Sequence, residues 1–478
     1  MAFFSATLLG VRPIPVEIEI DISSGLPFFQ IVGLPDAILR ESKTRVKSAI
    51  LQGGFEFPYE QRVVLNLAPS KVKKEGSGFE LGLAARILAS SGQIPTPELN
   101  VLFLGELALD GSIRSIPEIE ALAFAGHEHF SRGIKFDLVV VNKDDVKKIS
   151  HLNTQVLGVS HLSDFQGCKW WESGEISSFK DSTLAALRED KFKDLKFSEF
   201  WARHLTIAAL GGHHYFLCGP PGTGKTFFAE SLRLLLGSLK DEPEIELRLL
   251  NSVFQRPAHE FPWAAPHHSA STCGILGGGN PPRAGAITRA HGGVLFLDEL
   301  LEFSSSSLDS LREPIEKGHV EIFRAGSHVI FPSRFQLIAA TNPCRCGYWK
   351  AKFKNCRCMP HVRQGYLSRM SGPFFERFDI KIFCHRTEPD EKLVSGDEII
   401  SKIKFLRKNE TGDPVWTQTA LSGLQEKGNR QRFNFRTYEK VKSVASTIAR
   451  MDGFKSIQLK NITEATDYQN FKGLERPF

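Results

Sequence analysis

The chain has 478 residues, of which 41% are hydrophobic and 24% charged, and its formal net charge is +6. Its length allows two to four domains with separate cores, and the composition is that of a globular protein. No apolar run approaches the roughly 20 residues that span a bilayer, so no membrane segment is predicted. The first residues, "MAFFSATLLGVRPIPVEIEIDI", lack the pattern of a signal peptide, which favours a cytoplasmic protein.

The predicted elements divide the chain into four regions. In residues 1–171, "VEIEIDI" and "RVVLNLAP" alternate as strands do, and "DAILRESKTRVKSAILQ" has helical spacing. Residues 172–196 are polar and charged, as in a linker. A second α/β region covers 197–386, and 387–478 is predicted to be helical. The predicted fold class is therefore α/β multidomain.

The segment "HYFLCGPPGTGKTFFAESLRLLL" contains G-x-x-x-x-G-K-[ST] between an apolar strand and a helix. In this context backbone N–H groups close around phosphate oxygens at a helix N-terminus. Lys225 is expected to reach the β- and γ-phosphates of ATP, and Thr226 to hold Mg²⁺. The predicted nucleotide-binding residues are Gly219, Pro220, Pro221, Gly222, Thr223, Gly224, Lys225 and Thr226.

Three later segments end in polar residues that suit the same chemistry. The apolar strand in "GGVLFLDEL" ends in Asp298, expected to complete the Mg²⁺ shell with Thr226, and Glu299, expected to polarise the attacking water. "FQLIAATNPC" ends in Asn342, which could orient water or the γ-phosphate. "YLSRMSGPFFERFDIKI" places Arg377 at a helix end before a strand.

Four of the eight cysteines lie close together, in the order Cys344, Cys346, Cys356 and Cys358. Clustered thiols in a reducing compartment favour a metal over disulfides. Four thiolates fill a tetrahedral site, so the prediction is a structural zinc and not a catalytic one. Because C-x-C is less usual than C-x-x-C, free thiols in a basic loop remain the alternative.

Taken together, these motifs resemble an AAA+ ATPase of the magnesium-chelatase clade, as do "APHHSAS", "GAITRAHGGVLFLDEL" and "LREPIEKGHVEI". With "GLPDAILRES" and "NLAPSKVKKEGSGFELGLAARIL", the chain resembles the YifB/ComM family of bacterial proteins over about residues 3–470. The resemblance implies an AAA+ domain at 197–386 and a helical lid at 387–478. It also implies that Asn342 is the first sensor, Arg436 the second sensor, and Arg377 an arginine finger acting on a neighbouring subunit in a ring, expected to be a hexamer.

The N-terminal segments "KKEGSGFELGLAARILA" and "LGELALDGSIRSIP" resemble the proteolytic domain of Lon, which has the ribosomal S5 domain 2-like fold. That enzyme needs a serine activated by a lysine. Here Gly78 stands at the nucleophile position, with Ser77 beside it, and Glu120 stands at the lysine position. Residues 1–171 are therefore predicted to be a Lon-protease-like domain without peptidase activity, used for binding or assembly.

The resemblance implies an ATP-hydrolysing motor on DNA, similar to the ComM-type proteins associated with branch migration during uptake and recombination of transforming DNA. The alternative is a chelatase-type ATPase that remodels a protein or metal-insertion partner. Candidate phosphate contacts are the basic stretch Lys350–Arg369, which has no acidic residue, and a second group, Lys427, Arg430 and Arg432; either could be solvated surface. The chain departs from the family pattern in two places, so the preference for a particular nucleotide base is not predicted. The region Phe197–Trp201 differs from the family, and Ala264 stands in place of an arginine.

Overall fold

The computed structural model describes residues 2–33, 36–70, 72, 74, 78–149, 154–167, 169–173, 175–176, 189–239, 245–257, 259–324, 327–386, 391–408 and 414–471. The chain forms two compact units. The first comprises Met1–Asp181 and Arg248–Ala258, and the second comprises Ser182–Leu247 and His259–Phe478. Each unit has its own central sheet and its own hydrophobic core.

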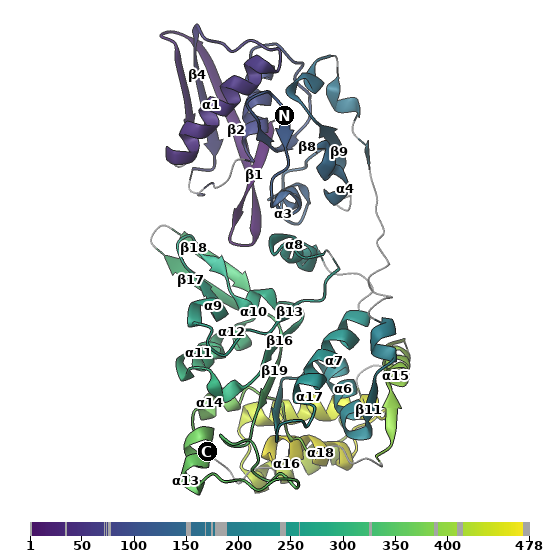
Figure 1. Ribbon diagram of the computed structural model, residues 1–478. Coiled ribbons are helices and arrows are strands. Elements are labelled where there is room, and N and C mark those ends of the chain that lie inside the picture. The colour runs from purple at the N-terminus through teal and green to yellow at the C-terminus, as the bar shows by residue number, and fades with distance from the viewer. Residues whose placement is uncertain are drawn as a thin grey trace. The chain divides into compact units, whose positions relative to one another are not determined.

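The first unit is built on an eight-stranded mixed sheet with the order β10-β9-β8-β5-β1-β2-β4-β3 (Figure 1). Its strands are β1 (Phe3–Leu9), β2 (Arg12–Ser24), β3 (Phe28–Val32), β4 (Gln61–Ala68), β5 (Val101–Leu104), β8 (Leu138–Asn142), β9 (Gln155–Val159) and β10 (Glu175–Ile176). A small hairpin pairs β6 (Glu106–Leu107) with β7 (Ile113–Arg114), and the short helices include α3 (Ile119–Ala123) and α4 (Val146–Ile149).

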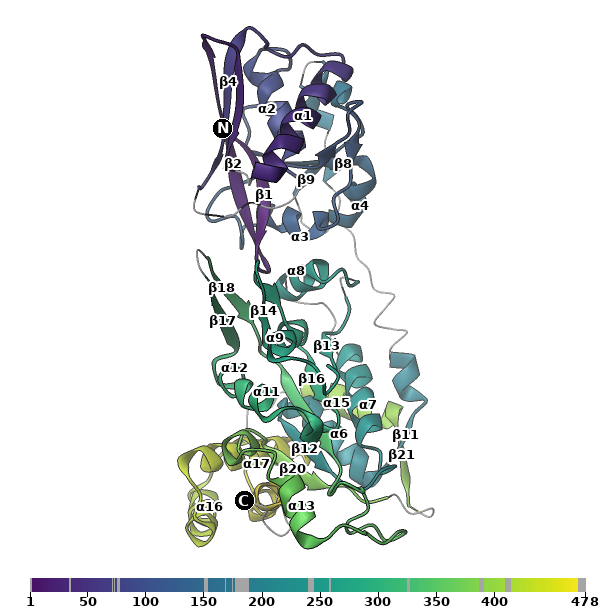
Figure 2. The same ribbon diagram turned by 60° about the vertical axis from the view of Figure 1, so that its left-hand side comes forward.

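Helices α1 (Asp36–Gln52) and α2 (Glu80–Ser90) lie on the same side of this sheet (Figure 2). The alternation of β2 explains the arrangement, since Val16 and Ile18 point into the core that α2 covers, whereas Glu19 is exposed. The strand predictions at 16–22 and 62–69 coincide with β2 and β4, and the helical pattern at 36–52 coincides with α1.

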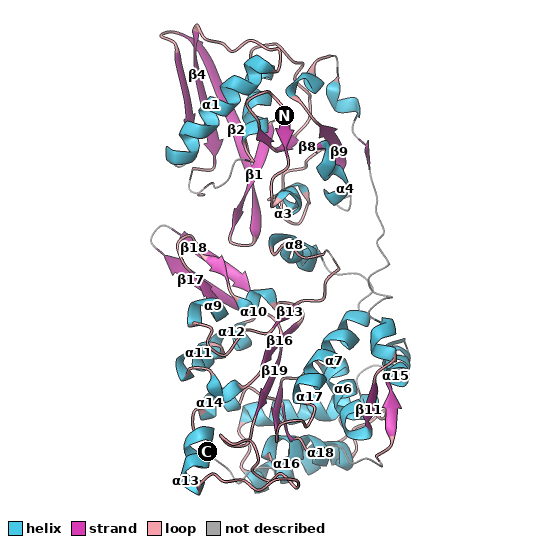
Figure 3. Ribbon diagram, viewed as in Figure 1, coloured by secondary structure: helices cyan, strands magenta, loops and turns pink. Residues whose placement is uncertain are grey.

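The second unit is built on a five-stranded parallel sheet with the order β13-β16-β19-β12-β20 (Figure 3). These strands are β12 (Tyr215–Cys218), β13 (Trp263–Ala264), β16 (Val294–Leu297), β19 (Gln336–Thr341) and β20 (Ile380–Phe383). Residues 215–218, 294–297 and 336–341 are buried throughout, as expected of strands covered on both faces. Because all five strands are parallel, their carboxyl ends meet at one edge of the sheet.

Hairpins and helices surround this sheet. Two hairpins pair β14 (Gly277–Gly278) with β15 (Arg283–Ala284) and β17 (His319–Arg324) with β18 (Ser327–Pro332). A further two-stranded antiparallel sheet pairs β11 (Lys196–Ser198) with β21 (Leu393–Ser395). The helices are α6 (Glu199–Gly211), α7 (Lys225–Ser238), α8 (Ile245–Val253), α9 (Thr272–Leu276), α10 (Ala286–Arg289), α11 (Ser305–Ser310), α12 (Arg312–Lys317), α13 (Pro360–Leu367), α14 (Gly372–Phe375), α15 (Gly396–Lys408), α16 (Gln418–Gln431), α17 (Phe435–Met451) and α18 (Leu459–Asn470).

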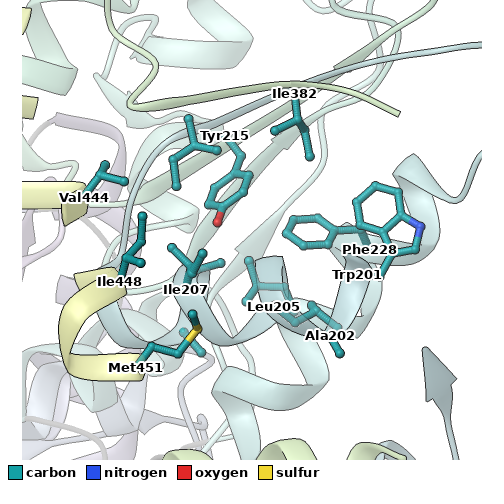
Figure 4. Close-up of a cluster of buried hydrophobic side chains, with 14 of the residues drawn as sticks. Trp201, Ala202, Leu205, Ile207, Tyr215, Phe228, Ile382, Val444, Ile448 and Met451 are labelled. Atoms are coloured by element: carbon teal, nitrogen blue, oxygen red, sulfur yellow. The ribbon is translucent and has the colours of Figure 1, made fainter. Parts of the chain in front are cut away.

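The helices predicted at the C-terminal end share a core with the parallel sheet. Figure 4 shows Val444, Ile448 and Met451 of α17 facing side chains of α6 and β12, among them Ile207 and Tyr215. Burying an aliphatic or aromatic side chain of this size contributes roughly 1.5–3 kcal/mol. These contacts hold α17 firmly against the sheet.

Part of the segment predicted as a linker, residues 172–196, contributes to the same core. Phe192 is fully buried and stacks on Phe197, with ring centroids 5.4 Å apart. Residues 174 and 177–188 of the predicted linker lie outside the described residues. In the parts of the chain that the structure describes, no helix is long and apolar enough to cross a bilayer.

Candidate active site

The loop Gly219–Gly224 connects β12 to α7 at the carboxyl edge of the parallel sheet. Gly222 and Gly224 have φ angles of +75° and +89°, a region that residues with a Cβ rarely adopt. A Cβ at Gly219 would lie 2.5 Å from the carbonyl oxygen of Cys384. The glycines are therefore required by the path of the backbone, which brings the loop to the start of α7, where backbone N–H groups can cradle phosphate.

Lys225, the first residue of α7, is held at this edge of the sheet. Its Nζ donates to the carbonyl oxygens of Gly219 (2.7 Å) and Pro220 (2.9 Å), and lies 3.4 Å from Oδ1 of Asn342. Burial lowers the pKa of the Lys225 ammonium, an effect opposed by the neighbouring Cys384, Cys218 and Asp298. The ammonium thus lies between the phosphate-binding loop and the tip of β19.

Thr226 and Asp298 meet across the same edge. The Thr226 hydroxyl donates to Oδ2 of Asp298 over 3.1 Å, and Oδ1 of Asp298 accepts the backbone N–H of Glu299 over 2.9 Å. A hydroxyl and a carboxylate in contact form the oxygen donor set that Mg²⁺ prefers. The structure therefore brings together Lys225, Thr226, Asp298 and Asn342, which the sequence predicted separately.

Glu299 follows Asp298 with a φ of +50°, which is uncommon for a residue other than glycine. Its Oε2 lies 3.4 Å from Nδ1 of His268. Both residues line a cleft of about 730 Å³ beside Thr226 and Asp298. The remaining lining residues are Lys191, Glu230, Arg233, Leu234, Phe261, Trp263, Ala265, Pro266, His267 and Phe296. Sequence reasoning noted "APHHSAS" but assigned no role to His268, whose partner lies 31 positions later.

The two predicted arginines lie together in the second unit. One oxygen of Glu316, Oε1, accepts from Nη2 of Arg377 over 2.8 Å and from Nη2 of Arg436. Arg377 is only 7% exposed, whereas Arg436 is about half exposed. Glu316, in α12, was not singled out from the sequence.

The four predicted cysteines also meet, in the loop 343–359 that follows β19, here named the cysteine loop. The Sγ of Cys344 lies 3.4 Å from that of Cys346 and 3.6 Å from that of Cys356, and the Sγ atoms of Cys346 and Cys356 are 3.6 Å apart. With Cys358, all four sulfurs lie within 4.8 Å of one another. These distances greatly exceed the roughly 2.05 Å of a disulfide.

The cysteine loop is packed against the nucleotide loop. A Cβ at Gly347 would lie 3.1 Å from Cδ of Pro221 and 3.9 Å from Cγ of Asn342. Cations also lie over its aromatic rings: Lys354 is 4.2 Å from the Tyr348 ring centroid. Further pairs are Lys350 and Arg363 with Trp349, and Arg386 with Phe353. The cysteine loop thus carries alternating basic and aromatic groups beside the nucleotide loop.

The second predicted basic group lies at the end of α16. Arg430 is paired with Glu426 over 2.5 Å, and Arg432 occupies the C-terminal cap with a φ of +55°. Part of this positive charge is therefore already neutralised by an acidic neighbour.

In the first unit the position that aligns with the Lon nucleophile is enclosed. A Cβ at Gly78 would lie 2.9 Å from Cδ1 of Ile116, so a serine side chain does not fit without movement. Ser77 lies outside the described residues. Burial raises the pKa of Glu120, and an acidic side chain cannot replace an activating lysine.

The region that departs from the family pattern before the nucleotide loop is aromatic. Trp201 is 5% exposed and packs on Phe228. A Cβ at Gly224 would lie 3.2 Å from Nε1 of Trp201. The ring centroids of Phe197 and Phe227 are 5.5 Å apart, and Phe227 is 41% exposed. Ala264, in β13, is buried. These aromatic residues pack beside the nucleotide loop and the first turn of α7.

Comparison with known proteins places this geometry in a family. The family described as "Magnesium chelatase, subunit ChlI" matches residues 191–392, and "Subunit ChlI of Mg-chelatase" matches residues 18–140. YifB of Escherichia coli, an uncharacterized protein, is 35% identical over 96% of this chain and 95% of its own length. The competence protein ComM of Haemophilus influenzae is 32% identical over 98% of this chain and 96% of its own.

The chain belongs to the YifB/ComM family. A shorter match, 30% identical over 34% of this chain and 35% of the relative, is to Lon protease 2 of Bacillus subtilis. Membership in the YifB/ComM family, with its chelatase-type AAA+ core, indicates an ATPase that uses ATP and Mg²⁺. The nucleotide loop and the Thr226–Asp298 pair fit both groups.

Proposed function

We propose that this protein is an oligomeric AAA+ motor that hydrolyses ATP and acts on DNA. Lys225 would bind the β- and γ-phosphates, and Thr226 with Asp298 would hold Mg²⁺, which neutralises phosphate charge when bound. Glu299 would take up a proton from the attacking water, with His268 beside it. Asn342 would orient that water or the γ-phosphate.

The observation that carries the DNA part of this proposal is the surface of the cysteine loop. A motor that moves over every sequence must grip phosphates, which carry no base information. Lysines and arginines alternating with aromatic rings suit this task, because cations bind the backbone and rings stack on exposed bases. This surface adjoins Asn342, so DNA bound there would lie next to the site of hydrolysis.

We also propose that the four cysteines of the cysteine loop hold a structural zinc ion. A tetrahedral Zn²⁺ with Zn–S distances of about 2.3 Å places its sulfurs about 3.8 Å apart. The sulfur separations of 3.4–3.6 Å are close to that value. Four thiolates complete the coordination, so zinc would fix the shape of the loop and take no part in hydrolysis.

The experiment is the rate of ATP hydrolysis with and without single-stranded or forked DNA. We expect DNA to stimulate hydrolysis, and DNA binding to weaken steeply as salt rises because each neutralised phosphate releases counterions. Lys350→Ala, Lys352→Ala and Lys354→Ala combined should reduce stimulation and flatten the salt dependence while basal hydrolysis persists.

The combined variant Lys427→Ala, Arg430→Ala and Arg432→Ala removes the same charge elsewhere and serves as the matched control. A greater loss of DNA-stimulated hydrolysis in this control would indicate that DNA binds at α16 and not at the cysteine loop. Wild-type protein that binds no DNA at low salt with ATP present would favour the alternative, a chelatase-type ATPase that remodels a protein or metal-insertion partner, consistent with the matched family.

A further inference from the structure

Two arginines of the second unit share a single carboxylate, and a third arginine lies near them. Arg377 follows α14, Arg436 is in the first turn of α17, and both donate to Oε1 of Glu316 in α12. Arg312 begins the same helix as Glu316, one turn earlier, and its charge acts on Arg377. Two carboxylates, Glu316 and Glu376, oppose the positive charge of these three arginines at Arg377, which leaves the cluster with an excess of positive charge.

The cluster has hydrogen-bonding capacity that the described residues do not use. Nε and Nη1 of Arg377 are buried and have no partner in the part of the chain that the structure describes, and the same is true of Nε of Arg312. Burial lowers the pKa of the Arg377 guanidinium, and Arg436 and Arg312 act in the same direction. A buried guanidinium with unused donors beside other arginines is suited to bind an anion with several oxygens, such as a phosphate.

This cluster and the nucleotide loop of the same chain lie at opposite edges of the parallel sheet. Strands β12 and β20 pair in register from Tyr215 with Ile380 to Cys218 with Phe383. The nucleotide loop follows Cys218, whereas Arg377 precedes Ile380. The four residues of each strand separate the two positions by about 13 Å at 3.3 Å per residue. The arginines therefore do not lie beside the nucleotide loop of their own chain.

We propose that Glu316 is a positioning residue that holds Arg377 and Arg436 together, so that the pair meets the terminal phosphate of ATP bound to a second copy of this chain. The proposal rests on the proposed ATPase function. Without the carboxylate, two guanidiniums at this separation repel each other. With it, α17 and α14 present their arginines as one unit.

The first experiment compares Glu316→Gln with Glu313→Gln. Both changes remove one negative charge from α12 and keep the side-chain size, but Glu313 pairs with the exposed Lys317. In Glu316→Gln we expect kcat to fall by about tenfold or more, with the Kd for ATP changed less than about threefold, because the lost stabilisation arises in the transition state. Glu313→Gln should match the wild type in both.

The second experiment mixes variants within one assembly. Lys225→Ala removes phosphate binding but keeps the arginines, whereas Glu316→Gln and Arg377→Ala keep the nucleotide loop. Lys225→Ala mixed with either of the other two should regain hydrolysis, since one chain supplies the loop and the other the arginine pair. Glu316→Gln mixed with Arg377→Ala should not exceed the residual rate of Glu316→Gln alone, because both defects lie on the same side of the contact. A general folding defect would not produce this pattern.

Failure of the proposal is distinguishable from failure of the proposed function. Wild-type protein that hydrolyses no ATP would overturn the proposed function. An active wild type together with a normal kcat in Glu316→Gln would overturn the role of Glu316. Activity regained on mixing Glu316→Gln with Arg377→Ala would also overturn it, since the two residues would then act in different chains.

Discussion

At the scale of single residues, side chains that follow three different strands meet at the carboxyl edge of the parallel sheet, and each has a different expected role in binding or hydrolysing ATP. The three N–H donors of Lys225 are directed at two backbone carbonyls and at Asn342, so phosphate binding would replace at least one of these hydrogen bonds. Glu299 adopts a left-handed backbone conformation that costs of order 1–3 kcal/mol and is commonly found at functional sites. The strain directs its carboxylate into the cleft that His268 also lines.

Two substitutions separate nucleotide binding from hydrolysis. Lys225→Ala should lose ATP binding, because the ammonium that contacts the phosphates is removed. Glu299→Gln should bind ATP normally and lower kcat by about 10²-fold or more, because an amide cannot accept the proton of the attacking water. Binding is measured with a fluorescent ATP analogue and hydrolysis by phosphate release. Wild-type turnover in Glu299→Gln would show that another group is the base.

At the scale of elements, the cysteine loop has no helix or strand of its own to stiffen it between β19 and α13. A bound metal would supply that rigidity, which explains why basic and aromatic groups can be displayed on a loop. Cys344 is fully buried and the other three thiols are partly exposed, so one side of the cluster faces the core.

We expect about one zinc per chain in elemental analysis of protein purified without chelator. Cys356→Ser should release the metal and lower the thermal midpoint by several degrees, since a ligand that binds only the folded state stabilises it. Ser305→Ala, at a hydroxyl that donates to the backbone carbonyl of Arg369, serves as a control of similar size. Metal-free protein with unchanged stability would favour free thiols in a basic loop.

The junction of α6, β12 and α17 contains buried neutral histidines. Nε2 of His213 donates to the Thr447 hydroxyl over 2.9 Å, because that hydroxyl in turn donates to the Ser443 carbonyl. Burial lowers the pKa of His213 to about 4 and that of His204 to about 3. The His214 ring accepts the backbone N–H of Leu337, and its pKa is also lowered by burial.

Stability should therefore fall on acidification. The unfolded chain protonates these histidines near pH 6.5, whereas folded His213 stays neutral until about pH 4. Between these values the unfolded state binds more protons, so the free energy of unfolding decreases as pH falls, by up to about 3 kcal/mol for His213 alone. His213→Gln should flatten the difference between urea midpoints measured at pH 7.5 and pH 5. An unchanged difference would mean that other groups dominate.

At the scale of the whole molecule, we expect a complete site to need residues from both edges of the sheet and hence from two chains. The rate of hydrolysis per chain should rise with protein concentration and level off once assembly is complete. Light scattering over the same dilution series identifies the assembled species, which we expect to be a hexameric ring. A constant rate per chain down to concentrations at which only monomer scatters would contradict the prediction.

The sequence predicted what depends on short segments and missed what depends on distant ones. The nucleotide loop, Asp298 and Asn342 each follow a recognisable apolar strand, and parallel pairing brings such strand ends to one edge. The helix at 36–52 was likewise predicted from the helical spacing of its apolar residues. Glu316 was not, because its partners lie 61 and 120 positions later and no local pattern links them. Phe192 was assigned to a linker because its neighbours are polar, although its ring is buried.

The path of the chain alternates between the two units: residues 1–181 belong to the first, 182–247 to the second, 248–258 to the first again, and 259–478 to the second. No single cut therefore yields both units complete, and a fragment ending at residue 181 lacks eleven residues of its own unit. Simple end-to-end fusion of two ancestral genes does not produce this order either. Residues 1–181 expressed alone should therefore be less stable than the same unit in the intact chain, because the segment 248–258 that completes it is missing.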